Sequence, residues 1–221
     1  GSADKGVGLG AGEIMFTGDY IYQSIDWWHG IIPLPSVEDP DEPYEHMGLL
    51  NSNILNIGLT IGLSDYWNIS LSQLLVERCM EWQARDPETG DLEPSVHHRT
   101  ECSSSDFDNS KGGYLGDTRL NFKYLLANQG KGPGNRVFIG GGLVIPSNNV
   151  LTESPFLTDV DYHYPEHRHF ALSDGTYKIF TDFQFFKKRI KMPVFWGTTF
   201  SIEYPLETSD YGFYPSTVYD L

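Results

Sequence analysis

The chain has 221 residues, and its 30 acidic side chains outnumber its 15 Lys and Arg, which gives a formal charge of −15. This acidity argues against nucleic-acid binding, which needs clustered Lys and Arg, and the 14% of aromatic residues argues against disorder. No segment approaches the ~18 consecutive apolar residues of a membrane helix, which excludes a helical membrane protein but not a membrane β-barrel, whose strands meet lipid on one face only.

The first twelve residues predict a flexible lead-in. The glycine-rich run Gly8–Gly12 has no strand before it and lacks the spacing of a dinucleotide-binding loop. No nucleophile elbow, HExxH or Walker motif occurs elsewhere. We therefore expect residues 13–221 to form one domain that is not an enzyme.

Alternating apolar and polar residues, the pattern of a half-buried strand, recur along this domain. In Asn53–Leu63, every second residue from Leu55 onward is Leu or Ile. The alternation changes phase near Gln73, which predicts a β-bulge. The predicted strands are 14–23, 53–63, 67–82, 116–126, 137–145, 177–185 and 194–204, with the start of an eighth at 216.

Long and short connections alternate between these strands. The long ones are 26–47, 83–112 and 146–168, and the short ones are 64–66, 130–135 and 187–192, with 206–215 of intermediate length. Outer-membrane barrels have this layout. We therefore predict an all-β fold, an antiparallel up-and-down transmembrane β-barrel with short periplasmic turns and long extracellular loops. The alternative is a soluble β-sandwich, whose strands show the same alternation with the apolar face on a protein core.

Charged and amide side chains alternate with aromatic ones in the middle of three predicted strands. Inside a barrel these side chains would line a polar lumen and pair across strands. On a soluble sheet they would form an ordinary solvated face. The candidate lumen-lining residues are Asp117, Arg119, Asn121, Lys123, Lys178, Asp182 and Glu203.

Residues 112–126, GGYLGDTRLNFKYLL, are followed by a short turn and by residues 138–146, FIGGGLVIP. These segments resemble the meta-pathway phenol-degradation family of outer-membrane transporter-type barrels. Members of that family have a Gly-Asp strand with alternating aromatics, a short turn and a Gly-rich strand that ends in Pro. The resemblance implies an outer-membrane channel for small organic molecules, with more strands than this sequence contains, and it implies no catalytic residue.

Three sets of residues suggest further sites in the loops. Cys79 and Cys102 predict a disulfide if the protein is exported, with two free thiols as the alternative. His163, His167 and His169 have spacings that suit a metal, but no further ligand completes a set, so surface histidines are expected. Acidic loop residues offer oxygens to Ca²⁺, although solvated acidic loops are the simpler interpretation. They are Glu38, Asp39, Asp41, Glu42, Glu45, Asp86, Glu88, Asp91 and Glu93.

The predicted function is passage of a small solute through a barrel in the outer membrane, with the lipid bilayer as its surroundings and no cofactor. A single-chain bacterial barrel has an even number of strands and must close. Because the eighth predicted strand is too short, we expect either a C-terminal part beyond Leu221 or closure by a partner protein or a second copy. The alternatives are a secreted sandwich that binds carbohydrate or another ligand through Trp27 and Trp28, and a non-conducting barrel for adhesion or assembly.

Overall fold

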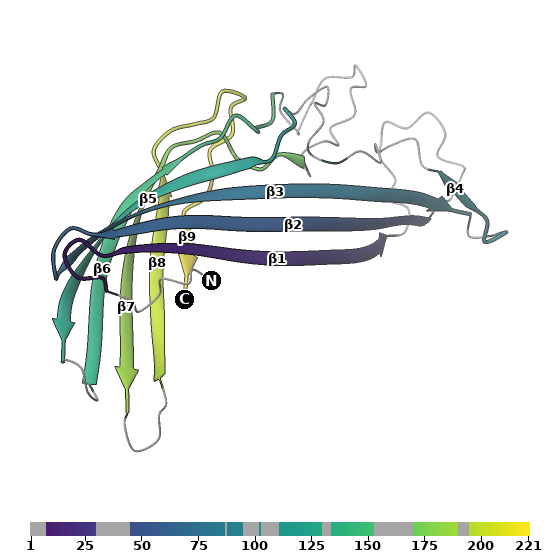
Figure 1. The fold of residues 1–221 in the computed structure, drawn as a ribbon. Coiled ribbons are helices and arrows are strands. Elements are labelled where there is room, and N and C mark those ends of the chain that lie inside the picture. Colours follow the sequence, from purple (N-terminus) through teal and green to yellow (C-terminus); the bar gives the residue numbers. More distant parts are fainter. Residues whose placement is uncertain are drawn as a thin grey trace.

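The computed structural model describes residues 8–29, 45–86, 88–94, 102, 111–129, 134–152, 170–189 and 195–221. Their strands form one antiparallel sheet, in which the strand direction turns progressively from β1 to β8 so that the sheet curls (Figure 1). The strands on its main path are β1 (Ile14–His29), β2 (Glu45–Gly62), β3 (Trp67–Arg85), β5 (Leu115–Asn128), β6 (Gly134–Ile145), β7 (Lys178–Lys188), β8 (Phe195–Pro205) and β9 (Val218–Asp220). The short β4 (Leu92–Pro94) pairs with β3 alone.

Each strand on the main path pairs with the next one along it, which is the predicted up-and-down order. Because neighbouring strands are antiparallel, successive connections lie at alternate ends of the sheet. The short connections after β2, β5 and β7 therefore share one end, and the longer ones share the other. The described strands belong to a single sheet, so they do not form the two packed sheets of a sandwich. The described residues contain no helix long and apolar enough to cross a membrane.

The first three strands are longer than predicted, with 16, 18 and 19 residues. At about 3.3 Å per residue, β3 is about 60 Å long. The second predicted strand begins at Asn53, whereas β2 begins at Glu45. The run Gly48–Leu50 interrupts the alternation there, although the pairing with β1 and β3 continues through it.

The phase change near Gln73 does not come from a bulge in β3. The strand pairs with β2 in one unbroken register, and the irregularity lies in its pairing with β5, where the extra residue belongs to β5. Val76 and Met80 therefore lie on the opposite face of β3 from Leu71. Both are buried, which explains why apolar residues occupy each face of β3 in turn.

The two faces of the sheet differ in composition and in exposure. The apolar face carries a continuous row of paired residues across seven strands: Phe16, Leu59, Leu71, Leu120, Leu143, Ile179 and Tyr204. Large side chains on it are open to solvent, up to 80% for Phe16. The other, polar face is on the inside of the curl, where Ser52, Thr60 and Asn68 are buried. A soluble sheet has the opposite arrangement.

The end of the expected lead-in lies on the polar face near the short turns. Leu9 and Asn68 exchange two hydrogen bonds, from the Leu9 amide to Oδ1 (3.1 Å) and from Nδ2 to the Leu9 carbonyl (3.0 Å). The Ala11 amide donates to Asp65 in the turn after β2. Residues 8–12 are thus held against the sheet, and residues 1–7 lie outside the described part of the chain.

Candidate functional site

The register places all seven candidate lumen residues on the polar face. Alternate residues of a strand share a face, and paired residues of neighbouring strands do so as well. The pairing aligns Arg119 with Val144 and Lys178, and Lys123 with Gly140 and Asp182. Glu203 pairs with Phe180, on the same face of β7 as Lys178 and Asp182. The seven residues selected from the sequence pattern therefore share one face of the sheet.

Four charged side chains form an ion-pair network near the end with the long connections. Arg119 Nη1 lies 2.8 Å from Glu203 Oε2, and Lys178 Nζ lies 3.3 Å from Glu203 Oε1 and 2.6 Å from Asp174 Oδ2. Glu203 is thus shared by two cations. The Arg119 side chain is 44% exposed and that of Glu203 is 16% exposed, so the network lies at an accessible surface.

The contact between Arg119 and Glu203 depends on the shape of the sheet. Their strands, β5 and β8, are separated by β6 and β7, so the two side chains meet because the polar face is concave. The Arg119 guanidinium lies over the Phe180 ring, 4.5 Å from its centre, and the ring lies over Gly142 of β6. The missing side chain at Gly142 leaves the space that Phe180 fills.

A second polar group lies nearer the short turns and is more deeply buried. Lys123 is only 1% exposed, and its Nζ lies 5.1 Å from the centre of the Phe138 ring. Gln184 donates to Asp182 Oδ1 at 3.3 Å. The Asp182 carboxylate covers Gly140, the residue that pairs with both Lys123 and Asp182. A cation and a carboxylate therefore flank a strand position that has no side chain.

Parts of the connection between β6 and β7 fold back onto the polar face. We call residues 146–151 and 170–176 the inner segment. The Ser147 amide donates to Asp117 (3.1 Å), and Arg78 Nη1 donates to the Ala171 carbonyl (3.3 Å). Phe170 packs against Met80 and Leu50. The inner segment therefore contacts the neighbouring strands β3 and β5 on the inside of the curl.

Asp174 of the inner segment was not among the predicted site residues. Its carboxylate binds Lys178, and its charge also reaches Tyr211. Burial raises the pKa of the Tyr211 hydroxyl, a hydrogen bond with Ser209 acts in the opposite direction, and the negative charge of Asp174 raises it further. The turn-forming run Ser173–Thr176, next to a charged strand residue, is the sequence signal that could have indicated this contact.

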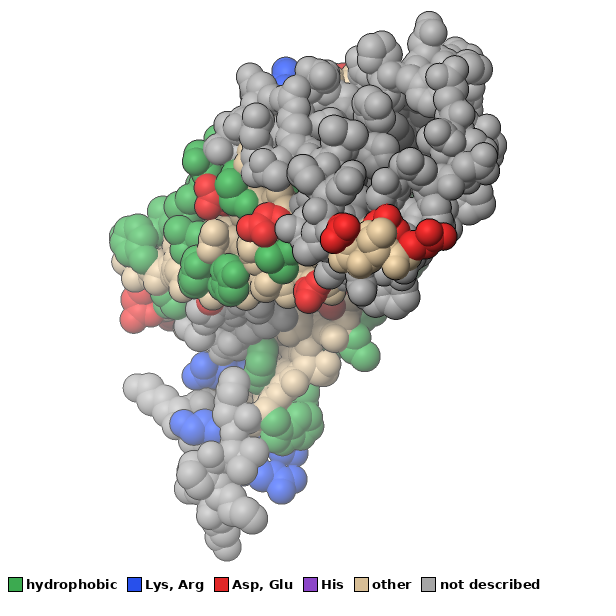
Figure 2. Space-filling view, turned by 90° about the vertical axis from the view of Figure 1, so that its right-hand side faces the viewer, with side chains coloured by type: hydrophobic (Ala, Val, Ile, Leu, Met, Phe, Trp, Pro, Cys, Tyr) green, Lys and Arg blue, Asp and Glu red, His purple; other side chains and the backbone are tan. Residues whose placement is uncertain are grey.

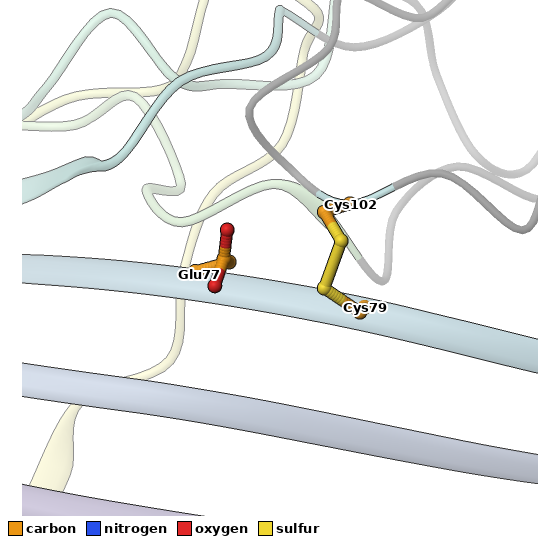
Figure 3. A group of neighbouring side chains, drawn as sticks. All are labelled: Glu77, Cys79 and Cys102. Atoms are coloured by element: carbon orange, nitrogen blue, oxygen red, sulfur yellow. A yellow bond between two sulfur atoms is a disulfide. The ribbon is translucent and has the colours of Figure 1, made fainter.

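The predicted disulfide is present: Cys79 of β3 is bonded to Cys102 (Figure 3). Among the described residues, the only close group of three His, Cys, Asp or Glu side chains consists of these cysteines and Glu77. Since both sulfur atoms are in the disulfide, they are not thiolate ligands. The bond fixes Cys102 against β3, with which it also forms an isolated β-bridge.

We expect the Cys79→Ser, Cys102→Ser double variant to unfold at lower denaturant concentration than the wild type. The disulfide closes a loop with a sequence separation of 23 residues, and loop-closure entropy for that length is worth about 3 kcal/mol. Urea unfolding of the oxidised protein, the reduced protein and the variant measures the effect. Equal midpoints for all three would show that the bond does not constrain the unfolded chain.

The other predicted sites are only partly described. His163, His167 and His169 lie outside the described residues, as do four of the acidic residues in the first long loop. Asp86 accepts hydrogen bonds from the backbone amides of Glu88 (2.7 Å) and Thr89 (3.3 Å), which lower the pKa of its carboxyl group. Asp86 thus stabilises a local turn, and the Ca²⁺ expectation stays a prediction.

Comparison with known proteins finds no matching protein family, no matching curated protein and no matching solved structure. The resemblance of residues 112–146 to an outer-membrane family therefore stays a prediction.

Proposed function

We propose that this chain forms part of the wall of an outer-membrane β-barrel and that small solutes pass along its polar face. The observation that carries the proposal is the inverted polarity of the sheet. Large apolar side chains cover the solvent-exposed face, whereas Ser, Thr, Asn, Lys and Asp side chains are buried inside the curl, together with Val, Met and Phe side chains. Exposed apolar surface of this extent favours a lipid environment.

The size of the apolar face supports this proposal. From Ile145 to Val137, β6 carries an apolar residue or a glycine at every second position on that face. This length is about 26 Å at 3.3 Å per residue, comparable with the apolar band of about 25 Å in outer-membrane barrels. Beyond it, towards the short turns, come Lys187, Lys188 and Arg189. In Figure 2, Lys and Arg side chains gather near this lower end of the molecule.

The described sheet has two edges, β1 and β8 with its short partner β9. A closed wall needs further strands along these edges, because an unpaired strand edge in lipid leaves backbone groups without hydrogen bonds. β1 and β9 are antiparallel to each other, since eight strands alternate in direction along the main path. Added strands that continue this alternation close the wall if their number is even.

Electrophoresis tests the proposed location. We expect the protein to be recovered from membranes only with detergent, and to migrate differently on SDS gels before and after boiling, because a closed barrel resists SDS until heated. A water-soluble protein without this heat-dependent shift would contradict the proposal. Samples that show the shift are then added to planar bilayers, where solute passage predicts stepwise current.

The polar face predicts how the current depends on charge. We expect the Arg119→Ala, Lys123→Ala double variant to shift ion selectivity towards cations, since two positive charges are removed from the polar face, one of them exposed at Arg119 and one buried at Lys123. The reversal potential in a salt gradient measures the selectivity, and the heat-dependent gel shift shows whether the variant folds. Unchanged selectivity in a folded variant would show that these residues do not line the pathway.

A non-conducting barrel is a second candidate, and the inner segment favours it. Phe170 and Thr176 are almost completely buried on the polar face, so this segment occupies space that an open pore would need. The bilayer experiment distinguishes the two candidates. If the protein shows the heat-dependent gel shift but carries no current, the result supports a non-conducting barrel with a role in adhesion or assembly.

A further inference from the structure

A groove of about 430 Å³ lies on the apolar face, where the apolar residues of β2 and β3 are followed by polar ones. Its floor consists of Leu55 and Leu75, which pair across β2 and β3. Tyr20 of β1 lies at one side of the groove, and Tyr114, just before β5, lies at the other. The next paired row along the strands is Asn53 and Glu77. The groove thus combines an apolar floor with a polar end.

At the polar end, two hydrogen bonds connect Tyr20 through Asn53 to Glu77. The Tyr20 hydroxyl donates to Asn53 Oδ1 (2.7 Å), and Asn53 Nδ2 donates to Glu77 Oε2 (3.3 Å). Among the described residues, this is the hydrogen bond that reaches the Glu77 carboxylate. A carboxylate accepts several hydrogen bonds and donates none, so the polar end has acceptor capacity left for a ligand that donates.

The position of Tyr114 is fixed by the backbone. Its carbonyl accepts a hydrogen bond from the Val76 amide at 2.7 Å, which holds Tyr114 beside the part of β3 that forms the floor. The disulfide lies next to the groove, with its sulfur atoms within 4.8 Å of a Glu77 carboxylate oxygen (Figure 3). The backbone of β3 thus holds the Tyr114 side of the groove, and the disulfide lies beside its polar end.

We propose that this groove binds a membrane lipid whose headgroup carries an ammonium group. The acyl chain would lie over Leu55 and Leu75 between the two tyrosine rings, and the ammonium group would donate hydrogen bonds to Glu77. The lining residues that the structure describes include one carboxylate and no Lys or Arg, so charge complementarity favours this headgroup over an anionic one. The inference rests on the proposed membrane location of the apolar face.

Native mass spectrometry of the detergent-extracted protein tests the inference. Phosphatidylethanolamine and phosphatidylglycerol with the same acyl chains are offered in equal amounts. We expect phosphatidylethanolamine to be retained preferentially, and Glu77→Gln to lower its retention by up to about fivefold, the range for an exposed charge pair. Glu81→Gln is the matched control. Glu81 lies on the same strand and the same face as Glu77, four residues further along and outside the groove.

Equal retention of the two lipids by the wild type, or equal effects of the two substitutions, would overturn the inference. Retention of phosphatidylglycerol in Ca²⁺ and its loss in EDTA would also overturn it, because Glu77 would then bind a phosphate through a cation. If a preparation shows the gel shift and the current but no lipid preference, the proposed lipid site is wrong and the proposed function is not contradicted. If the gel shift is absent, the proposed function fails, and dihexanoyl phosphatidylethanolamine in buffer tests the groove without a membrane.

Discussion

Gly142→Ala is expected to destabilise the sheet by about 3 kcal/mol or more, at the upper end of the range for overpacking. A Cβ atom at this position would overlap the Leu120 carbonyl of β5 and would lie 2.9 Å from the Phe180 ring. Backbone in a paired strand moves less readily than a side-chain end. The substitution should therefore disturb both the pairing of β5 with β6 and the position of the ring beneath Arg119.

Urea unfolding followed by tryptophan fluorescence measures this effect. Gly18→Ala is the matched control, since Gly18 lies in β1 and an added Cβ meets no atom of the described residues within 4 Å. We expect the control to match or slightly exceed the wild type, because alanine restricts the unfolded chain more than glycine does. Equal unfolding midpoints for the two variants would show that the close packing around Gly142 relaxes at little cost.

The strand order could be predicted from the sequence because two independent patterns agree. Period-two alternation located the strands, and the alternation of long and short connections indicated an up-and-down order, which the pairing confirms. The boundaries were less accurate where alternation fails, as in Gly48–Leu50. At such positions, hydrogen bonding to two neighbouring strands determines the structure, and the side-chain pattern does not report it.

The inner segment could not be predicted from any pattern along the chain. Its contacts with Asp117, Arg78 and Met80 join residues far apart in sequence, and they depend on the curl of the sheet. The same contacts explain the change of phase near Gln73, where the predicted bulge lies in the pairing with β5 and the extra residue belongs to β5. Val76 and Met80 are apolar because the inside of the curl is covered there, a property that alternation within one strand does not contain.

The charged residues show the same division between local and non-local information. Their shared face follows from spacing within β5, β7 and β8, and it was predicted. Their partners were not, because Arg119 reaches Glu203 across two intervening strands, and Asp174 reaches Lys178 from a connection. Sequence spacing thus located the surface, while curvature and a returning segment determined which charges meet on it.

Glu203→Lys is expected to give the largest change in ion selectivity under the proposed function. The network of Arg119, Lys178, Asp174 and Glu203 contains two cations and two carboxylates. The substitution leaves three cations and one carboxylate, so the local field attracts anions. We expect the reversal potential in a salt gradient to shift towards anions, with at least about a threefold change in the permeability ratio.

Two companion variants make this prediction specific to the network. Glu203→Gln removes the charge while keeping the shape, and it should shift selectivity in the same direction by a smaller amount. Asp210→Lys makes the same change of charge on an exposed residue of the connection after β8, where solvent screens it. A folded Glu203→Lys variant with wild-type selectivity, or with no more effect than Asp210→Lys, would place the solute pathway away from Glu203. The selectivity shift, if seen, would instead assign the pathway to the concave face between β5 and β8.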